Sequence, residues 1–169
     1  MNIYITTDTH FGHQAIIDRG FRPEDFEKKI LDGFKNLKRN DLLIHLGDVG
    51  FTNKKALTRI FKKIKCKKVL CKGNHDKKSN SWFYDVGFDF VGQYFVDRCF
   101  GKRVLFSHIP IRDLGQYDYN ICGHFHDNQP TRYEAQFLAI YDKQKHILLA
   151  LERNDYKLFS LKQVLREKQ

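Results

Sequence analysis

Five short blocks of polar residues in this chain contain side chains that can bind metal ions, and each block directly follows an apolar run. The side chains are those of Asp8 and His10, Asp48, Asn74 and His75, His108, and His124 with His126. Imidazole nitrogens combined with carboxylate and amide oxygens suit Mn, Fe, Zn or Ni, and no thiolate accompanies them as in a structural zinc knot. So many ligands exceed the needs of one ion. The pattern therefore predicts a centre that holds more than one divalent metal.

Each block taken singly has an ordinary structural explanation. Gly47-Asp48 after a strand is a common turn, and a single histidine on an apolar strand is usually packed in the core. Turn chemistry, however, gives no reason to place histidine or aspartate after all five runs. The joint pattern therefore favours a shared site.

The hydrophobic pattern predicts the elements that must position these blocks. Apolar runs predict strands at residues 2–6, 42–46, 69–71, 103–106 and 119–122. Apolar residues at helical spacing predict helices over residues 24–38 and around Leu57, Ile60, Phe61 and Ile64. Strands that alternate with helices favour an α/β fold, in which ligands bind outside the carboxyl ends of the strands. We therefore expect the five blocks to converge.

The remainder of the chain predicts further elements of the same domain. After Ala135 the pattern indicates a strand over residues 137–141, a turn, a strand over residues 146–151 and a terminal helix capped by Ser160. No linker, repeat or low-complexity segment interrupts the 169 residues, of which 41% are hydrophobic. One domain spanning residues 1–169 is the expectation.

The order of the blocks resembles that of the calcineurin-like metallophosphoesterase superfamily. The matching motifs are Asp8-Thr9-His10, Gly47-Asp48, Gly73-Asn74-His75-Asp76, Ser107-His108 and Gly123-His124-Phe125-His126. The short chain, which has no inserted cap domain, is similar to the small bacterial and phage phosphoesterases of that superfamily. The resemblance implies an α/β sandwich of two mixed β-sheets flanked by helices.

The resemblance also implies a role for each matching residue. Asp8, His10 and His126 would hold one metal ion, Asn74, His108 and His124 a second, and Asp48 would bridge the two. Mn is favoured, and Ni, Zn, Fe or Mg are compatible.

The reaction implied is hydrolysis of a phosphate ester by in-line attack of a metal-activated hydroxide. His75 would donate a proton to the leaving alkoxide, and Asp76 would hold or charge-stabilise its ring. A solvated carboxylate is the alternative for Asp76.

Four other polar residues are candidates of lower specificity. His13, in the first polar loop, and Arg22, before a proline, could contact the substrate, although loop residues of these types are usually solvated. His45 and His146 lie in apolar, strand-like runs, where we expect packed core histidines.

The charge of the chain favours anionic partners. Lys and Arg number 30 against 20 Asp and Glu, which gives a formal net charge of +10. Between Asp48 and Asp76 there is no acidic residue, so the positive charge is concentrated in the segment Lys54–Lys72. This segment could attract a nucleotide or nucleic acid, or it could simply solvate a helix, and Trp82, Phe83 and Tyr84 could stack bases if they are exposed.

The location expected from the sequence is the cytoplasm. No run approaches the roughly 20 apolar residues of a membrane span, and the N-terminus lacks a signal-peptide pattern. The four cysteines show no CxxC spacing and suit free thiols.

The function favoured is that of a phosphodiesterase acting on nucleotide or nucleic-acid esters, because no cap narrows the site. A phosphomonoesterase is the nearest alternative, since the same residues serve both reactions. A non-catalytic scaffold that binds metal and a macromolecule is a third, but the presence of His75 and all seven ligand positions argues against it.

Overall fold

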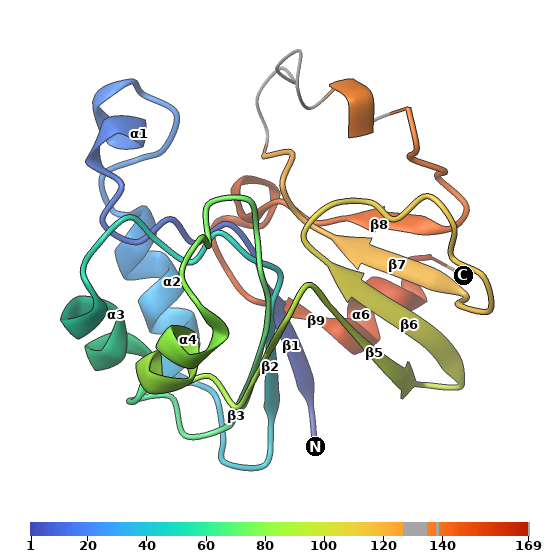
Figure 1. Ribbon diagram of the computed structural model, residues 1–169, viewed down its shortest axis with the longest axis horizontal. Helices are drawn as coiled ribbons and strands as arrows, with labels where there is room; N and C mark the ends of the chain where they lie inside the picture. Colours follow the sequence, from blue (N-terminus) through green and yellow to red (C-terminus); the bar gives the residue numbers. More distant parts are fainter. Residues whose placement is uncertain (127–134, 138, 169) are drawn as a thin grey trace.

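Two β-sheets packed against each other form the centre of the protein, with helices flanking them (Figure 1). The computed structural model describes residues 1–126, 135–137 and 139–168. Within these residues one sheet has five strands, in the order β4-β3-β2-β1-β9, and the other has four, in the order β5-β6-β7-β8. The predicted α/β sandwich of two mixed sheets is confirmed.

The first sheet carries three of the polar blocks at one edge. Its strands are β1 (Ile3–Thr6), β2 (Leu42–His45), β3 (Lys67–Cys71), β4 (Phe90–Gly92) and β9 (Phe159–Ser160). The strands β1 to β4 run parallel, with Ile5 paired to Ile44 and Ile44 to Val69. Because β1, β2 and β3 end at the same edge, the blocks that follow them leave the sheet side by side.

The second sheet carries the other two blocks. Its strands are β5 (Tyr94–Cys99), β6 (Lys102–Ser107), β7 (Tyr119–Cys122) and β8 (His146–Leu148). β5 runs antiparallel to β6, whereas β6, β7 and β8 run parallel. Ser107 pairs with Cys122, so the blocks after β6 and β7 also start next to each other.

The helices are short and bury one face. They are α1 (Gln14–Asp18), α2 (Phe26–Lys35), α3 (Lys54–Phe61), α4 (Asn80–Val86), the 3-10 helix η1 (Leu151–Asn154) and α6 (Leu161–Arg166). The side chain of Asn53 caps α3 by accepting a hydrogen bond from the Ala56 N–H. No helix among the described residues is long and apolar enough to cross a membrane.

Two hydrophobic clusters fill the layers. The first lies between the first sheet and helices α2 to α4, and it includes Phe34, Phe61 and Leu70. The second lies between the sheets and includes Ile44 and Phe106. Because both sheets contribute to the second cluster, we propose that the chain forms one domain.

The strands predicted before the polar blocks and the two predicted amphipathic helices are confirmed, with shifted ends. The strand predicted at 137–141 is wrong, because residues 135–137 are helical and residues 139 and 140 form a turn; residue 138 lies outside the described residues. A short apolar run is compatible with either element, and length alone does not decide between them. The next predicted strand ends early, at Leu148, and the chain enters η1 at Leu151.

Six of the labelled elements were not predicted. These are α1, α4, β4, β5, η1 and β9. β5 alternates between exposed and partly buried residues at the edge of its sheet, so its sequence lacks the apolar run that marks the inner strands. Ser160 does precede the terminal helix, but its side chain makes no capping hydrogen bond.

Candidate metal centre

The five blocks meet where the carboxyl ends of β1, β2, β3, β6 and β7 come together. The Asp8 N–H donates to the Gly47 carbonyl (2.9 Å), and the His10 N–H donates to the Asp48 carbonyl (3.1 Å). The His124 N–H donates to Asp8 Oδ2 (3.0 Å), which connects the two sheets. The structure therefore brings the predicted blocks into one place.

Five residues in these blocks adopt the left-handed backbone conformation, which residues other than glycine rarely do. The φ angles are 48° at Asp8, 46° at His10, 56° at Asp48, 78° at His124 and 37° at His126. Such conformations cost roughly 1–3 kcal/mol each and persist only where the surroundings hold them. Backbone strain at residues whose side chains can bind metal ions indicates that these loops serve a functional site.

Two glycines allow the loops to approach this closely. A Cβ atom on Gly73 would overlap the Asp48 side chain, and one on Gly123 would overlap the Thr7 side chain. At both positions the glycine backbone lies directly against a side chain of a neighbouring loop, so a larger residue would not fit there.

Asp8, His10 and His126 form one group of ligand-type side chains. Asp8 Oδ1 lies 3.8 Å from His10 Nε2 and 3.7 Å from His126 Nε2. Among the described residues, Asp8 Oδ1 and His10 Nε2 are buried and have no hydrogen-bond partner. Buried polar atoms rarely stay unsatisfied, and a divalent cation would satisfy both. The donor set therefore fits a metal ion.

Asn74, His108 and His124 form a second group. His108 Nδ1 donates a hydrogen bond to the Leu46 carbonyl (2.7 Å), which fixes the ring. His108 Nε2 then lies 2.9 Å from Asn74 Oδ1 and 3.0 Å from His124 Nδ1. An imidazole that donates a hydrogen bond from one ring nitrogen to a carbonyl, and leaves the other nitrogen facing a cluster of ligand-type residues, is typical of a metal ligand.

Asp48 lies between the two groups. Its Oδ2 is 3.8 Å from His10 Nε2 in the first group and 3.6 Å from His108 Nε2 in the second. Its Oδ1 accepts a hydrogen bond from the His75 backbone N–H (2.9 Å). This position fits the bridging role that the family resemblance implies.

Burial changes the protonation of this cluster. It raises the pKa of the Asp48 carboxyl to about 7, opposed by His108 and reinforced by the charge of Asp8. It also lowers the pKa of His10 to about 4, although Asp8 opposes this shift. Burial would raise the pKa of Asp8 as well, but its contacts with the surrounding histidines outweigh burial and lower that pKa. A bound cation would favour the ionised form of Asp48 and the neutral form of His10.

Asp76 has a different role from the one predicted. Its Oδ2 accepts hydrogen bonds from the N–H groups of Asp48 (2.7 Å) and Gly73 (2.9 Å), and its Oδ1 accepts one from Val49 (3.0 Å). Asp76 was predicted to hold or charge-stabilise the His75 ring, and the holding role is wrong because these hydrogen bonds go to backbone N–H groups. The charge-stabilising role agrees with the structure in direction, since the charge of Asp76 acts to raise the pKa of His75 against the lowering effect of burial. The solvated alternative is wrong because Asp76 is buried. Asp76 fixes the backbone that carries Asp48.

His75 and His13 lie at the rim of the cluster. The His75 side chain is 46% exposed, and its Nε2 is 3.9 Å from Asp48 Oδ2. The ring of Phe51, which the sequence analysis did not single out, lies 5.0 Å from that of His75 and 4.0 Å from that of His13. Both histidines therefore border the entrance.

Arg22 is buried rather than solvated. Its Nε and Nη2 donate to Glu152 Oε1 at 2.9 Å and 2.7 Å, and the same oxygen accepts a hydrogen bond from His126 Nδ1 (3.0 Å). Burial would raise the pKa of Glu152, but the His126 hydrogen bond and the Arg22 charge lower it to about 2. These contacts place Arg22 behind His126, where its guanidinium binds a carboxylate, in contrast to the predicted phosphate contact. Glu152 belongs to no motif, and no signal in the sequence marked it.

The other predicted core residues are confirmed as buried. His45 accepts a hydrogen bond from the Gly47 N–H, and His146 contacts the Ile111 carbonyl. The four cysteines are buried free thiols.

Two hollows open beside the cluster, one next to each ligand group. The first, of about 230 Å³, is lined by His10, His13, Ile16, Phe21, Arg22, His75, His126 and Glu152. The second, of about 260 Å³, is lined by residues that include Lys72, Asn74, Gln93, Tyr94, His108 and His124. Phe21 in the first hollow and Tyr94 in the second are more than half exposed.

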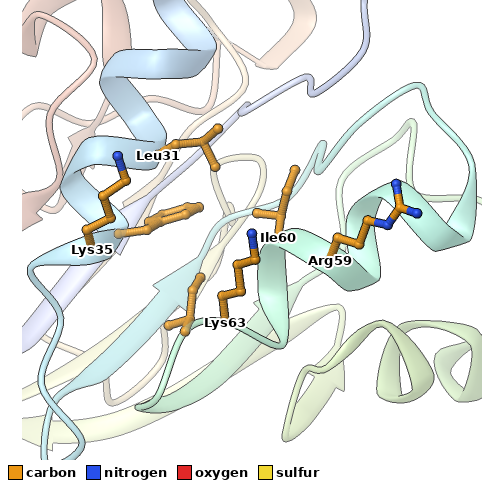
Figure 2. A pocket seen from close by; sticks show the side chains of 7 residues that line it. Leu31, Lys35, Arg59, Ile60 and Lys63 are labelled. Atoms are coloured by element: carbon orange, nitrogen blue, oxygen red, sulfur yellow. The ribbon is translucent and has the colours of Figure 1, made fainter.

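A third hollow lies between α2 and α3 (Figure 2). Its apolar lining includes Leu31 and Ile60, and Lys35, Arg59 and Lys63 contribute positive charge. No histidine, aspartate, glutamate or cysteine lines it, so it is separate from the metal centre.

The basic segment Lys54–Lys72 is partly neutralised. Lys54 pairs with Asp85 (2.6 Å) and Lys67 with Asp89 (2.9 Å). The buried Lys68 donates to two backbone carbonyls. These lysines support the structural explanation, while the exposed Lys55 on α3 and Lys62 and Lys63 after it leave a basic surface.

Comparison with known proteins identifies relatives along nearly the whole chain. The family model described as calcineurin-like phosphoesterase (Metallophos) matches residues 1–164. The uncharacterized protein MJ1445 of Methanocaldococcus jannaschii is 28% identical over 97% of this chain and 89% of its own. The crystal structure of AQ665, a protein of unknown function from Aquifex aeolicus, has a TM-score of 0.74 and 29% identity, with 98% of both chains covered.

Two more distant structures share the fold. An archaeal phosphodiesterase has a TM-score of 0.50 and 19% identity, with 76% of both chains covered. The nuclease MPE of Pseudomonas putida has a TM-score of 0.53 and 20% identity, with 73% of this chain and 61% of the nuclease covered.

Replacing Asp76 by alanine should destabilise the metal-free protein by about 3 kcal/mol or more, because three buried N–H groups would lose their acceptor. Chemical denaturation of the variant and the wild type measures this difference. The exposed Asp85→Ala serves as a control and should leave the free energy of unfolding nearly unchanged, because solvent screens its ion pair with Lys54. Equal stability of the Asp76 and Asp85 variants would contradict the role assigned to Asp76.

Proposed function

This chain belongs to the calcineurin-like phosphoesterase family, and we propose that it hydrolyses phosphodiesters of nucleotides or nucleic acids with two divalent metal ions. The observation that carries the hydrolytic part is the position of the buried Asp48 carboxylate, which lies between His10 of one ligand group and His108 of the other. A carboxylate shared in this way suits a pair of closely spaced ions.

Each residue of the cluster has a proposed role in metal binding or proton transfer. Asp8, His10 and His126 would hold one ion, Asn74, His108 and His124 the other, and Asp48 both. When bound, such ions supply acidification of water and neutralisation of charge on the phosphoryl oxygens. His75, which is exposed at the rim with its Nε2 3.9 Å from Asp48 Oδ2, would donate a proton to the leaving oxygen. Mn is the metal we propose first, with Ni, Zn, Fe and Mg as alternatives.

The two hollows support a diester over a monoester. A phosphodiester carries an organic group on each side of phosphorus, whereas a monoester carries only one. The cluster has a hollow beside each ligand group, and exposed aromatic rings line both, Phe21 in one and Tyr94 in the other. Aromatic rings stack on nucleobases with roughly 1–3 kcal/mol per base. The substrate class that fits this arrangement is a nucleoside diester.

Charge and location complete the proposal. The exposed Lys55 on α3, and Lys62 and Lys63 directly after this helix, give a basic surface suited to a nucleic-acid backbone. Of the predicted stacking residues, Phe83 is in the core and Tyr84 is exposed on α4.

The buried free thiols suit a reducing compartment, so we propose the cytoplasm. The nuclease and the phosphodiesterase that share the fold are in line with this reading.

Metal-stripped protein resupplied with Mn²⁺ should hydrolyse bis-p-nitrophenyl phosphate with a higher kcat/KM than p-nitrophenyl phosphate, because both hollows would be filled. Asp48→Asn should lower turnover by about 100-fold or more, since it removes the shared carboxylate. The exposed Asp25→Asn should not change it. A preference for the monoester would identify a phosphomonoesterase instead. Two bound ions without turnover of either ester would favour the scaffold alternative.

Replacing His75 by alanine should lower turnover of a dinucleotide by about 100-fold to 10,000-fold while both metal ions stay bound, because the leaving alkoxide needs a proton. The loss should be much smaller for bis-p-nitrophenyl phosphate, whose leaving phenolate is stable without one. His13→Ala, at the same rim, should change KM for both esters alike. Wild-type rates of dinucleotide cleavage in the His75 variant would rule out this role.

A further inference from the structure

A buried ion pair contacts His126, and neither of its members belongs to the five polar blocks found in the sequence. Arg22 precedes α2, and Glu152 lies on η1, at the other end of the chain. The side chains of Arg22 and Glu152 are only 2% and 11% exposed. A salt bridge this deep needs accurate geometry to offset the loss of hydration.

The contacts converge on one oxygen atom. Glu152 Oε1 accepts hydrogen bonds from Arg22 Nε (2.9 Å), Arg22 Nη2 (2.7 Å) and His126 Nδ1 (3.0 Å). Arg22 Nη2 also lies 3.2 Å from His126 Nδ1, but its shorter contact is with Glu152 Oε1 (2.7 Å). Because a carboxylate only accepts hydrogen bonds, the His126 contact with Glu152 assigns the ring proton to Nδ1, and Arg22 Nη2 then donates to Glu152. The unprotonated Nε2 is then left facing Asp8 Oδ1, 3.7 Å away.

Arg22 also contacts two aromatic rings. Its guanidinium lies 5.0 Å from the ring centre of Phe26 and 5.6 Å from that of Tyr156. Phe26 and Tyr156 are members of the first hydrophobic cluster. The orientation of the His126 ring is thus tied to the core through Glu152 and Arg22.

We infer that Glu152, held by Arg22, is a positioning residue that fixes the tautomer and orientation of His126 for metal binding. This inference rests on the proposed function, since it presupposes that His126 is a metal ligand. A carboxylate that accepts the distal N–H of a ligating histidine raises its basicity, and loss of such a group typically weakens metal affinity by about 10-fold to 100-fold. His126 needs this support more than the other ligands, because its side chain is 23% exposed whereas that of His108 is 3% exposed.

The rival role for Arg22 is direct binding of the substrate. Its Nη1 has no hydrogen-bond partner among the described residues, and the side chain contributes to the first hollow. The two roles differ in what they change. A positioning role alters metal affinity in the absence of substrate, whereas substrate binding alters KM alone.

The test is a Mn²⁺ titration of the purified full chain, followed by EPR, for the wild type, Glu152→Gln and the exposed control Glu24→Gln. We expect two ions per chain in the wild type and the control. In Glu152→Gln one of the two should bind about 10-fold to 100-fold more weakly, with the other unchanged. The visible spectrum of the Co²⁺-loaded variant should change as well, because the ligand geometry at one ion is altered.

A second variant controls for misfolding. Glu152→Gln alone leaves the buried Arg22 charge without its partner, which could destabilise the fold. The double variant Arg22→Met/Glu152→Gln removes both charges and should show the same selective loss of affinity for one ion. Unchanged affinity for both ions in both variants would overturn the inference while leaving the proposed function intact. So would an Arg22→Lys variant with a raised KM and normal metal affinity. A wild-type chain that binds no ion would overturn both.

Discussion

The constraint on which this structure depends is the burial of two carboxylates and three imidazoles in one place, those of Asp8, Asp48, His10, His108 and His124. Asp8 and Asp48 are each only 2% exposed, and their charges add to one another. Placing like charges in a poorly hydrated site is unfavourable unless cations balance them. The left-handed backbone at both residues and the unsatisfied Asp8 Oδ1 are in line with our proposal that bound divalent ions complete this site.

The fold supplies what this constraint requires by joining two sheets at their strand ends. The parallel strands β1, β2 and β3 deliver Asp8, Asp48 and Asn74, while β6 and β7 of the other sheet deliver His108 and His124. The apolar cluster between the sheets therefore helps to set the distance between the ligand groups. Asp76 accepts hydrogen bonds from the backbone of two of the loops and so connects them. Glu152 binds both His126 and Arg22, and thereby connects His126 to the first hydrophobic cluster.

The sequence was informative wherever a pattern was local. Apolar runs of inner strands and the polar blocks after them are contiguous, so the strands, the two amphipathic helices and the convergence of the site could be predicted. The edge strand β5 and the short α1 lack such runs and were missed. The roles of Asp76, Arg22 and Glu152 could not be predicted either, because each depends on which distant atoms face a side chain. Asp76 turned out to bind backbone N–H groups, and Arg22 meets Glu152 across 130 positions of the chain.

The measurement that most directly tests the dinuclear centre is the EPR spectrum of the Mn²⁺-loaded protein together with the number of ions per chain. We expect two Mn²⁺ ions with a spin-coupled signal in the wild type, and loss of that coupling in Asp48→Asn because the shared carboxylate is gone. A single isolated Mn²⁺ per chain, or coupling that survives in Asp48→Asn, would rule out a centre shared through Asp48.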